Sequence, residues 1–410
     1  MTPQYLFYIL IGILLIEFIW DTYLNHKNAK WYNKPIPKEL EGVFDEKEYL
    51  KSQDYKKVNY HFSILSSIFS LVLILLFFFL EGFAWVDQWV RTYTENPILV
   101  SLLFIGVLML GNDLISTPFS YYHTFVIEEK FGFNKSSKKL FWFDKLKGLI
   151  LMLLIGGGLL FVIIWFYEKT AHNFWIYTWG FVAVFSVFIN LFYSSLIVPL
   201  FNKQTPLEEG ELKNAIQDFA QKVGFKMNNI FVIDGSKRSS KANAYFAGFG
   251  AKKRIVLYDT LINDLEIDEI VGVLAHEVGH YKKKHTFYNM VLSILTTGLT
   301  LFILSLFIDS PMLAKALSVN IPSFHIGIIA FGILYSPISE ITGLLMNMLS
   351  RKFEYQADNY AKTKYDGKPL ISALKKLSKN SLSNLTPHPL YVFMHYSHPT
   401  LLQRILNLRK

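Results

Sequence analysis

The residues best suited to chemistry form the short sequence HEVGH, from His276 to His280. On an α-helix, two histidines four residues apart lie on one face, so both imidazoles can bind one Zn²⁺ at about 2 Å. Glu277 between them is then placed to take a proton from a water molecule. The alternative is a chance match, with both histidines solvated or packed in a core, so the surrounding sequence has to decide.

The sequence in front of the motif predicts a helix on separate grounds. Apolar residues recur at helical spacing over 265–275, and acidic residues occupy what would be the first turn. Asn263 followed by Glu266 fits a capping box at the start of this helix.

A second group of candidate ligands lies near the C-terminus. Glu354 and Asp358 share one face of a predicted helix. Considered alone, such a pair is more often a solvated surface. Together with HEVGH, Glu354 would complete the two-His, one-Glu set of a catalytic zinc site that keeps one position open. Asp358, one turn later, is placed to accept the other ring N–H of a ligand histidine.

Long apolar stretches explain a composition that is 52% hydrophobic, too apolar for an ordinary soluble enzyme. We expect an α-helical polytopic membrane protein with about seven transmembrane helices that enclose a chamber. The first stretch lacks the basic start and small-residue cleavage site of a signal peptide, so it is interpreted as a retained span. The predicted spans are roughly 5–20, 61–86, 97–116, 148–167, 174–200, 287–308 and 323–346.

Basic residues predict the orientation of these spans. The segments after spans one, three, five and seven carry 8, 6, 13 and 11 lysines and arginines, whereas each of the other three carries one. Basic segments stay on the cytoplasmic side, so HEVGH and the C-terminus are expected there and the N-terminus outside. The basic residues behind the net charge of +9 are thus distributed as membrane topology requires. Because the sequence also has no nucleic-acid-binding motif, this charge does not predict nucleic-acid binding.

The same topology brings the candidate ligands together. His280 comes shortly before span six and Glu354 shortly after span seven. These two spans are joined by a short outer segment, so they are expected to be antiparallel neighbours, and the ligands should lie at similar depth. Asn112, Asp113, Asn190 and Glu340 lie within apolar stretches, where they would either face a chamber or pack between helices.

The polar insert that carries HEVGH predicts a small α+β unit. An amphipathic helix and three strands are expected over 207–223, 229–234, 243–250 and 254–258. An extended peptide could add to the edge of such a sheet, although strands that merely pack fit the pattern equally well. We divide the chain into spans one to five with their loops (1–200), the insert (201–286), spans six and seven (287–346) and a cytoplasmic tail (347–410).

The tail also holds His398 and Arg404, which could bind an oxyanion or the terminal carboxylate of a peptide. Considered alone, His398 is more often a structural or surface histidine. The pattern assigns no role to His285 or His395.

With these residues considered together, the chain resembles the integral-membrane zinc metalloproteases of the CAAX prenyl protease 1 family. The resemblance rests on an ordered set of motifs over nearly the whole chain: 122–134, 199–203, 235–246, HEVGH, 350–358 and 397–404. It implies a ring of seven helices around a large chamber. It also implies one Zn²⁺ per chain on His276, His280 and Glu354, with Glu277 as general base. Asn243, His398 and Arg404 would contact substrate or oxyanion, and the peptide would lie along a strand that includes Ala244 and Tyr245.

Lys241-Ala242 departs from the His-Ser of eukaryotic members, and the chain is shorter than theirs. These departures suggest a bacterial homologue in the cytoplasmic membrane; a eukaryotic one would lie in the endoplasmic reticulum. The expected protein is a monomeric membrane endopeptidase, in contact with lipids, that cleaves near the C-terminus of peptides or lipidated, CAAX-type peptides, or cleaves membrane proteins. The alternatives are a scaffold or transporter that has kept a zinc site, and a protease with its metal deep in the bilayer. The charges at Asp268, Glu269 and 282–284 argue against the last.

Overall fold

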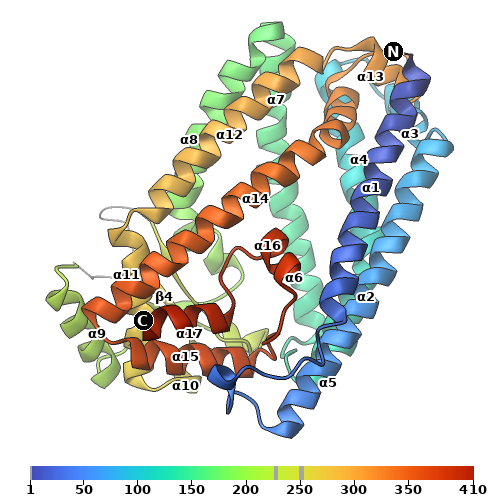
Figure 1. The fold of residues 1–410 in the computed structure, drawn as a ribbon. Coiled ribbons are helices and arrows are strands. Elements are labelled where there is room, and N and C mark those ends of the chain that lie inside the picture. The colour runs from blue at the N-terminus through green and yellow to red at the C-terminus, as the bar shows by residue number, and fades with distance from the viewer. Residues whose placement is uncertain (1, 226–229, 249–253) are drawn as a thin grey trace.

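The computed structural model describes residues 2–225, 230–248 and 254–410, and most of this chain is helical (Figure 1). Within these residues, six helical stretches are long and apolar enough to cross a membrane. They are α1 (Pro3–Ala29), α2 (Glu46–Phe79), Pro97–Phe131, Lys138–Leu200, α12 (His285–Phe307) and α14 (Phe324–Lys364). The third comprises α4 (Pro97–Tyr122), a π-helical segment (His123–Glu128) and α5 (Glu129–Phe131).

The stretch Lys138–Leu200 holds two crossing helices. It comprises α6 (Lys138–Leu151), a π-helical segment (Met152–Gly156), α7 (Gly157–Thr170), a 3₁₀ turn (Ala171–Asn173) and α8 (Phe174–Leu196). The rings of Phe166 and Phe181 lie 6.2 Å apart, whereas fifteen residues of one straight helix would separate them by about 22 Å. The chain therefore reverses at Ala171, whose φ is +46°, and the seven predicted spans are confirmed.

Two predicted details are wrong. Span two was expected to reach Val86, but α2 ends at Phe79, and α3 (Gly82–Arg91) follows as a separate helix. Glu81 takes the left-handed conformation between them, with φ +53°, and this turn interrupts no apolar pattern. The capping box of α11 (Ile267–Lys282) is formed by Glu266 and Glu269. Asn263 lies within α10 (Asp259–Asp264), because a short helix precedes the expected one.

The spans contact one another along narrow seams. Only 6–17% of the residues in their most apolar windows are buried, much less than close packing around one core would bury. Most side chains in these windows therefore face away from the other spans, and the chamber expected from the sequence stays a prediction. Among the polar residues within spans, Asn112 and Glu340 are exposed, and Asp113 pairs with Lys145 of α6. The antiparallel spans α12 and α14 contact each other, with Thr300 and Tyr335 hydroxyls 2.9 Å apart.

The insert forms a four-stranded sheet in the order β1-β2-β4-β3. The strands are β1 (Gln204–Pro206), β2 (Ile230–Ile233), β3 (Ala244–Ala247) and β4 (Arg254–Tyr258). β2 and β4 are parallel, and the other pairs are antiparallel. The three predicted strands are present as β2, β3 and β4, although the predicted strand positions 229 and 249–250 lie outside the described residues. The three-residue strand β1 was missed. β3 lies at one end of the sheet, and among the described residues no strand pairs with its outer edge.

The C-terminal segment 347–410 folds back onto the insert. It continues α14 into α15 (Gly367–Asn380), α16 (Pro389–His395) and α17 (Leu401–Arg409). The predicted amphipathic helix is α9 (Glu211–Lys222), and α9, α11, α14 and α15 share one apolar core with the sheet. Leu257 of β4, Leu274 of α11 and Ala361 of α14 are fully buried in this core. The core fixes α11 against α14, and these two helices carry the candidate ligands.

Candidate metal centre

Close packing of α11 on α14 brings the candidate ligands together. A Cβ atom at Gly279 would lie 3.1 Å from the Cα and carbonyl oxygen of Ala357, closer than side chains normally pack. Glycine at the fourth position of HEVGH therefore allows the two helix backbones to approach. Glu354, one turn before Ala357, consequently faces His276 and His280.

The three side chains have the spacing of a tetrahedral metal site. The Nε2 atoms of His276 and His280 lie 3.1 Å apart. Glu354 lies 3.4 Å from His276 through Oε2 and 3.2 Å from His280 through Oε1. Ligands about 2.05 Å from a tetrahedral Zn²⁺ are about 3.3 Å apart. The Oε2 atom of Glu354 is also buried without a hydrogen-bond partner, as a metal ligand would be. The residues therefore fit zinc.

Asp358 and Arg404 fix the orientation of His276 through its Nδ1 atom, which is the ring nitrogen that does not face the other candidate ligands. Nδ1 of His276 lies 2.9 Å from Oδ1 of Asp358, and the Arg404 guanidinium donates to both Asp358 oxygens at 3.0 and 2.6 Å. Burial and the positive charge of Arg404 lower the pKa of His276, but hydrogen bonds with Asp358 and Glu354 outweigh both and raise it to about 9. The carboxylates thus make this imidazole a more basic ligand.

The remaining polar candidates from the tail also lie here. Nε2 of His398 is 3.4 Å from Oε1 of Glu354, its Nδ1 is 2.9 Å from the Ser397 hydroxyl, and 63% of its side chain is exposed. Arg404 is close to Glu354 as well, at 3.6 Å, but only 12% of its side chain is exposed. Glu277 is partly exposed on the ligand-bearing helix. His398 is thus more accessible to a substrate than Arg404.

His285, to which the sequence assigned no role, belongs to this cluster. Its Nδ1 lies 3.1 Å from Nδ1 of His280, and its Nε2 lies 2.8 Å from Oε1 of Gln356. Only five residues separate it from His280, a spacing that does not share a helix face. α11 ends at Lys282, and Lys284, with φ +59°, is the N-cap of α12, so the chain changes direction there and His285 begins α12. The sequence signal that could have identified His285 is its position shortly after HEVGH.

Cavities connect β3 with the candidate ligands. Asn243 precedes the strand and is exposed, and Ala244 and Tyr245 pair with Leu257 and Val256 of β4. A cavity of about 750 Å³ is lined by Asn243, Tyr245 and Phe246 together with α8. A second, of about 450 Å³, joins Phe246 and Gly248 to the ligand His280. The two cavities share Phe246 and Gly248, so together they connect the end of β3 with His280.

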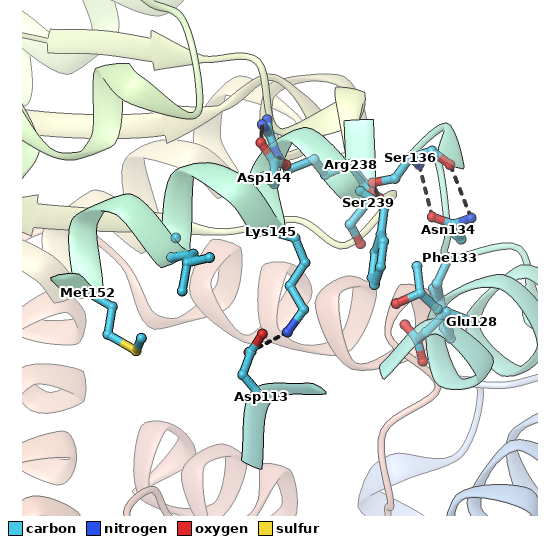
Figure 2. A pocket seen from close by; sticks show the side chains of 14 residues that line it. Asp113, Glu128, Phe133, Asn134, Ser136, Asp144, Lys145, Met152, Arg238 and Ser239 are labelled. Atoms are coloured by element: carbon cyan, nitrogen blue, oxygen red, sulfur yellow. Dashed lines mark hydrogen bonds and ion pairs between the residues drawn. The ribbon is translucent and has the colours of Figure 1, made fainter. Parts of the chain in front are cut away.

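Ion pairs tie the loop before β3 to the membrane helices. Arg238 donates to both oxygens of Asp144 on α6 at 2.8 and 2.9 Å, and Lys241 lies 2.7 Å from Glu128. Figure 2 shows the adjoining cavity of about 530 Å³, where Arg238 and Asp144 lie on one side and Lys145 reaches toward Asp113. These pairs position the start of the edge strand relative to the spans.

Comparison with known proteins agrees with this geometry. A family model described as "CAAX prenyl protease N-terminal, five membrane helices" matches residues 25–203, and the model "Peptidase family M48" matches residues 206–410. The chain belongs to the CAAX prenyl protease 1 family of M48 peptidases. It is therefore a multi-pass membrane metalloendopeptidase, and a scaffold or transporter without proteolysis is disfavoured.

Relatives of this family match along the whole chain. CAAX prenyl protease 1 of Saccharomyces cerevisiae is 36% identical and covers 97% of this chain and 94% of its own length. The Homo sapiens homolog is 32% identical, with 96% and 93% covered. The crystal structure of S. mikatae Ste24p superposes with a TM-score of 0.94 at 36% identity over 99% of both chains. These relatives are eukaryotic, and the bacterial origin suggested by Lys241-Ala242 stays a prediction.

Proposed function

We propose that the protein is a zinc endopeptidase that cleaves prenylated CAAX-type peptides near their C-termini at the cytoplasmic face of the membrane. The observation that carries the zinc assignment is the 3.1–3.4 Å spacing of the His276, His280 and Glu354 ligand atoms. When bound there, zinc would polarise the scissile carbonyl and acidify a water molecule.

The chain's own residues supply the proton transfers and the positioning. Glu277 takes the proton of the attacking water and passes it to the leaving amine nitrogen. His398 donates a hydrogen bond to the developing oxyanion, a role that its exposure and position beside Glu354 support. Arg404, with its guanidinium bonded to Asp358, acts on the oxyanion at longer range through its charge.

The substrate peptide would add to the sheet as an extra strand. The unpaired edge of β3 offers backbone groups from Ala244 and Tyr245, and Asn243 offers an exposed amide at its start. The names of the matched family and its relatives support a lipidated peptide, whose lipid chain would lie among the apolar spans. The membrane would be the bacterial cytoplasmic membrane or the endoplasmic reticulum, and the enzyme a monomer.

Glu277→Gln tests the mechanism. The variant should keep one zinc per chain and lose about 10³-fold in kcat, within the range of general acid–base catalysis. Zinc content by atomic absorption and cleavage of a farnesylated CAAX peptide are the measurements. Full activity in this variant would exclude Glu277 as the base. The unmodified twin of the peptide is the control for lipid specificity, and equal cleavage of both would point to general membrane-protein degradation instead.

A further inference from the structure

His285 is a buried histidine outside the ligand set, and every polar atom of its ring is engaged. It is 2% exposed, and its ring stacks on Phe353 with centroids 4.1 Å apart and planes at 10°. One ring nitrogen faces His280 and the other faces Gln356. Its orientation is therefore set from three sides, by α11, by α14 and by its own place at the start of α12.

The hydrogen bonds allow one arrangement of protons in the neutral pair. Oε1 of Gln356 can only accept, so Nε2 of His285 must carry the hydrogen. Nδ1 of His285 then has a lone pair and accepts from Nδ1–H of His280, 3.1 Å away. His280 is left with a lone pair on Nε2, the atom that faces His276 and Glu354.

The two ligand histidines are thus held by different chemistry. His276 is held by the carboxylate of Asp358, which Arg404 supports. For His280, the described contacts of Nδ1 include no carboxylate. This nitrogen instead faces the neutral ring of His285. A neutral acceptor fixes the tautomer without adding a negative charge behind the metal.

We propose that His285 is a positioning residue that fixes His280 in the tautomer whose Nε2 binds the metal. This inference rests on the proposed zinc site. His285 acts through His280 and touches neither the metal nor the substrate.

Two substitutions at one position separate the acceptor from the ring. His285→Phe keeps an aromatic ring against Phe353 but removes the acceptor, and His285→Asn keeps an acceptor near the place of Nδ1. Full-length protein in detergent is stripped of metal and titrated with zinc against a chromophoric chelator. We expect about 10- to 100-fold weaker zinc binding for His285→Phe, the usual effect of losing such a partner, and a change below about threefold for His285→Asn. Unchanged zinc binding in His285→Phe overturns the proposal.

Gln356→Leu provides a second variant in which His285 itself stays in place. It removes the acceptor that fixes the His285 tautomer, so zinc binding should weaken while the thermal unfolding midpoint of the metal-free protein stays close to wild type. Zinc binding equal to wild type in this variant also overturns the proposal. His61→Gln, on the exposed face of α2, is the matched control for loss of a histidine and should bind zinc normally.

The outcomes distinguish this proposal from the proposed function. If the wild-type protein fails to bind zinc, or if Glu277→Gln keeps full activity, the proposed function fails. If the wild type binds zinc and cleaves peptide but His285→Phe binds zinc equally well, only the role of His285 fails. In a folded His285→Phe with weakened zinc binding, saturating zinc should restore most of the kcat, because the reacting groups are unchanged.

Discussion

Among the described residues, a buried His–Asp pair bound by an arginine lies at each end of α14. At the C-terminal end of α14, His276 contacts Asp358, which is bound by Arg404. At the opposite end, Nε2 of His325 lies 2.8 Å from Oδ1 of Asp87, and Arg91 donates to the same carboxylate at 2.9 Å. Figure 1 shows the two ends, near α17 and near α3, far apart along α14.

The clusters differ in the second nitrogen of the imidazole. Nδ1 of His325 lies 2.9 Å from the Ser101 hydroxyl, and the ring is fully buried, so both nitrogens are used. His276 uses Nδ1 for Asp358 and keeps Nε2 directed toward His280 and Glu354. Similar residues therefore form a structural junction of α3, α4 and α14 in one place and part of the candidate metal centre in the other. What distinguishes the two is the second imidazole nitrogen, which faces other candidate ligands in His276 and a serine hydroxyl in His325.

The largest difference should follow loss of the third ligand. Glu354→Ala should reduce peptide hydrolysis by at least about 10³-fold, because metal activation is lost together with the contribution of Glu277, worth about 10²–10⁴-fold. Zinc content should fall well below one per chain, as measured by atomic absorption. Zinc retained at one per chain would show that Glu354 is not a ligand.

The opposite cluster should respond in stability instead. Asp87→Asn removes the charge that pairs with Arg91 and His325, and breaking a buried pair of this kind costs about 3–5 kcal/mol. The midpoint of thermal unfolding in detergent should fall, whereas zinc content and kcat of the folded fraction should match wild type. A loss of zinc with no loss of stability would contradict the comparison.

The same substitution in the zinc cluster should have a smaller effect, seen in metal binding. Asp358→Asn weakens the hold on Nδ1 of His276, and zinc affinity should fall about 10- to 100-fold. Competition with a chromophoric chelator measures the zinc affinity of Asp358→Asn, and Asp87→Asn, measured in the same way, is the matched control. Equal zinc affinity in the two variants would mean that Asp358 does not support the ligand.

The smallest effect is a pH dependence of stability. Burial raises the pKa of Asp87, but hydrogen bonds with His325 and Arg91 outweigh it and hold the pKa below its ordinary value. The pair therefore contributes fully above the ordinary aspartate pKa of about 3.9. Its contribution is lost as the pH falls through the lower value of the folded state. Unfolding midpoints measured below pH 5 should fall more steeply for wild type than for Asp87→Asn, and parallel slopes would contradict this.

Periodicity and topology were enough to predict that His276, His280 and Glu354 come together in one cluster. HEVGH and Glu354 each belong to a helix with a clear apolar pattern, and the antiparallel spans place both on the same side of the membrane. Two other features depended on contacts that no local pattern records. His285 is brought to His280 by the left-handed conformation of Lys284, and Asp87 meets His325 from a position 238 residues away. The end of α2 was missed because its turn at Glu81 lies within an apolar stretch.

Both clusters sit on one continuous helix, since α14 runs from Phe324 to Lys364. His325 and Glu354 are thus about 44 Å apart along its axis. A tilt of α14 by about one degree around the junction at His325 would displace Glu354 by about 0.8 Å, which is enough to disturb a metal ligand. A metal bound at the far end of α14 would therefore restrict the angle at which this span crosses the membrane.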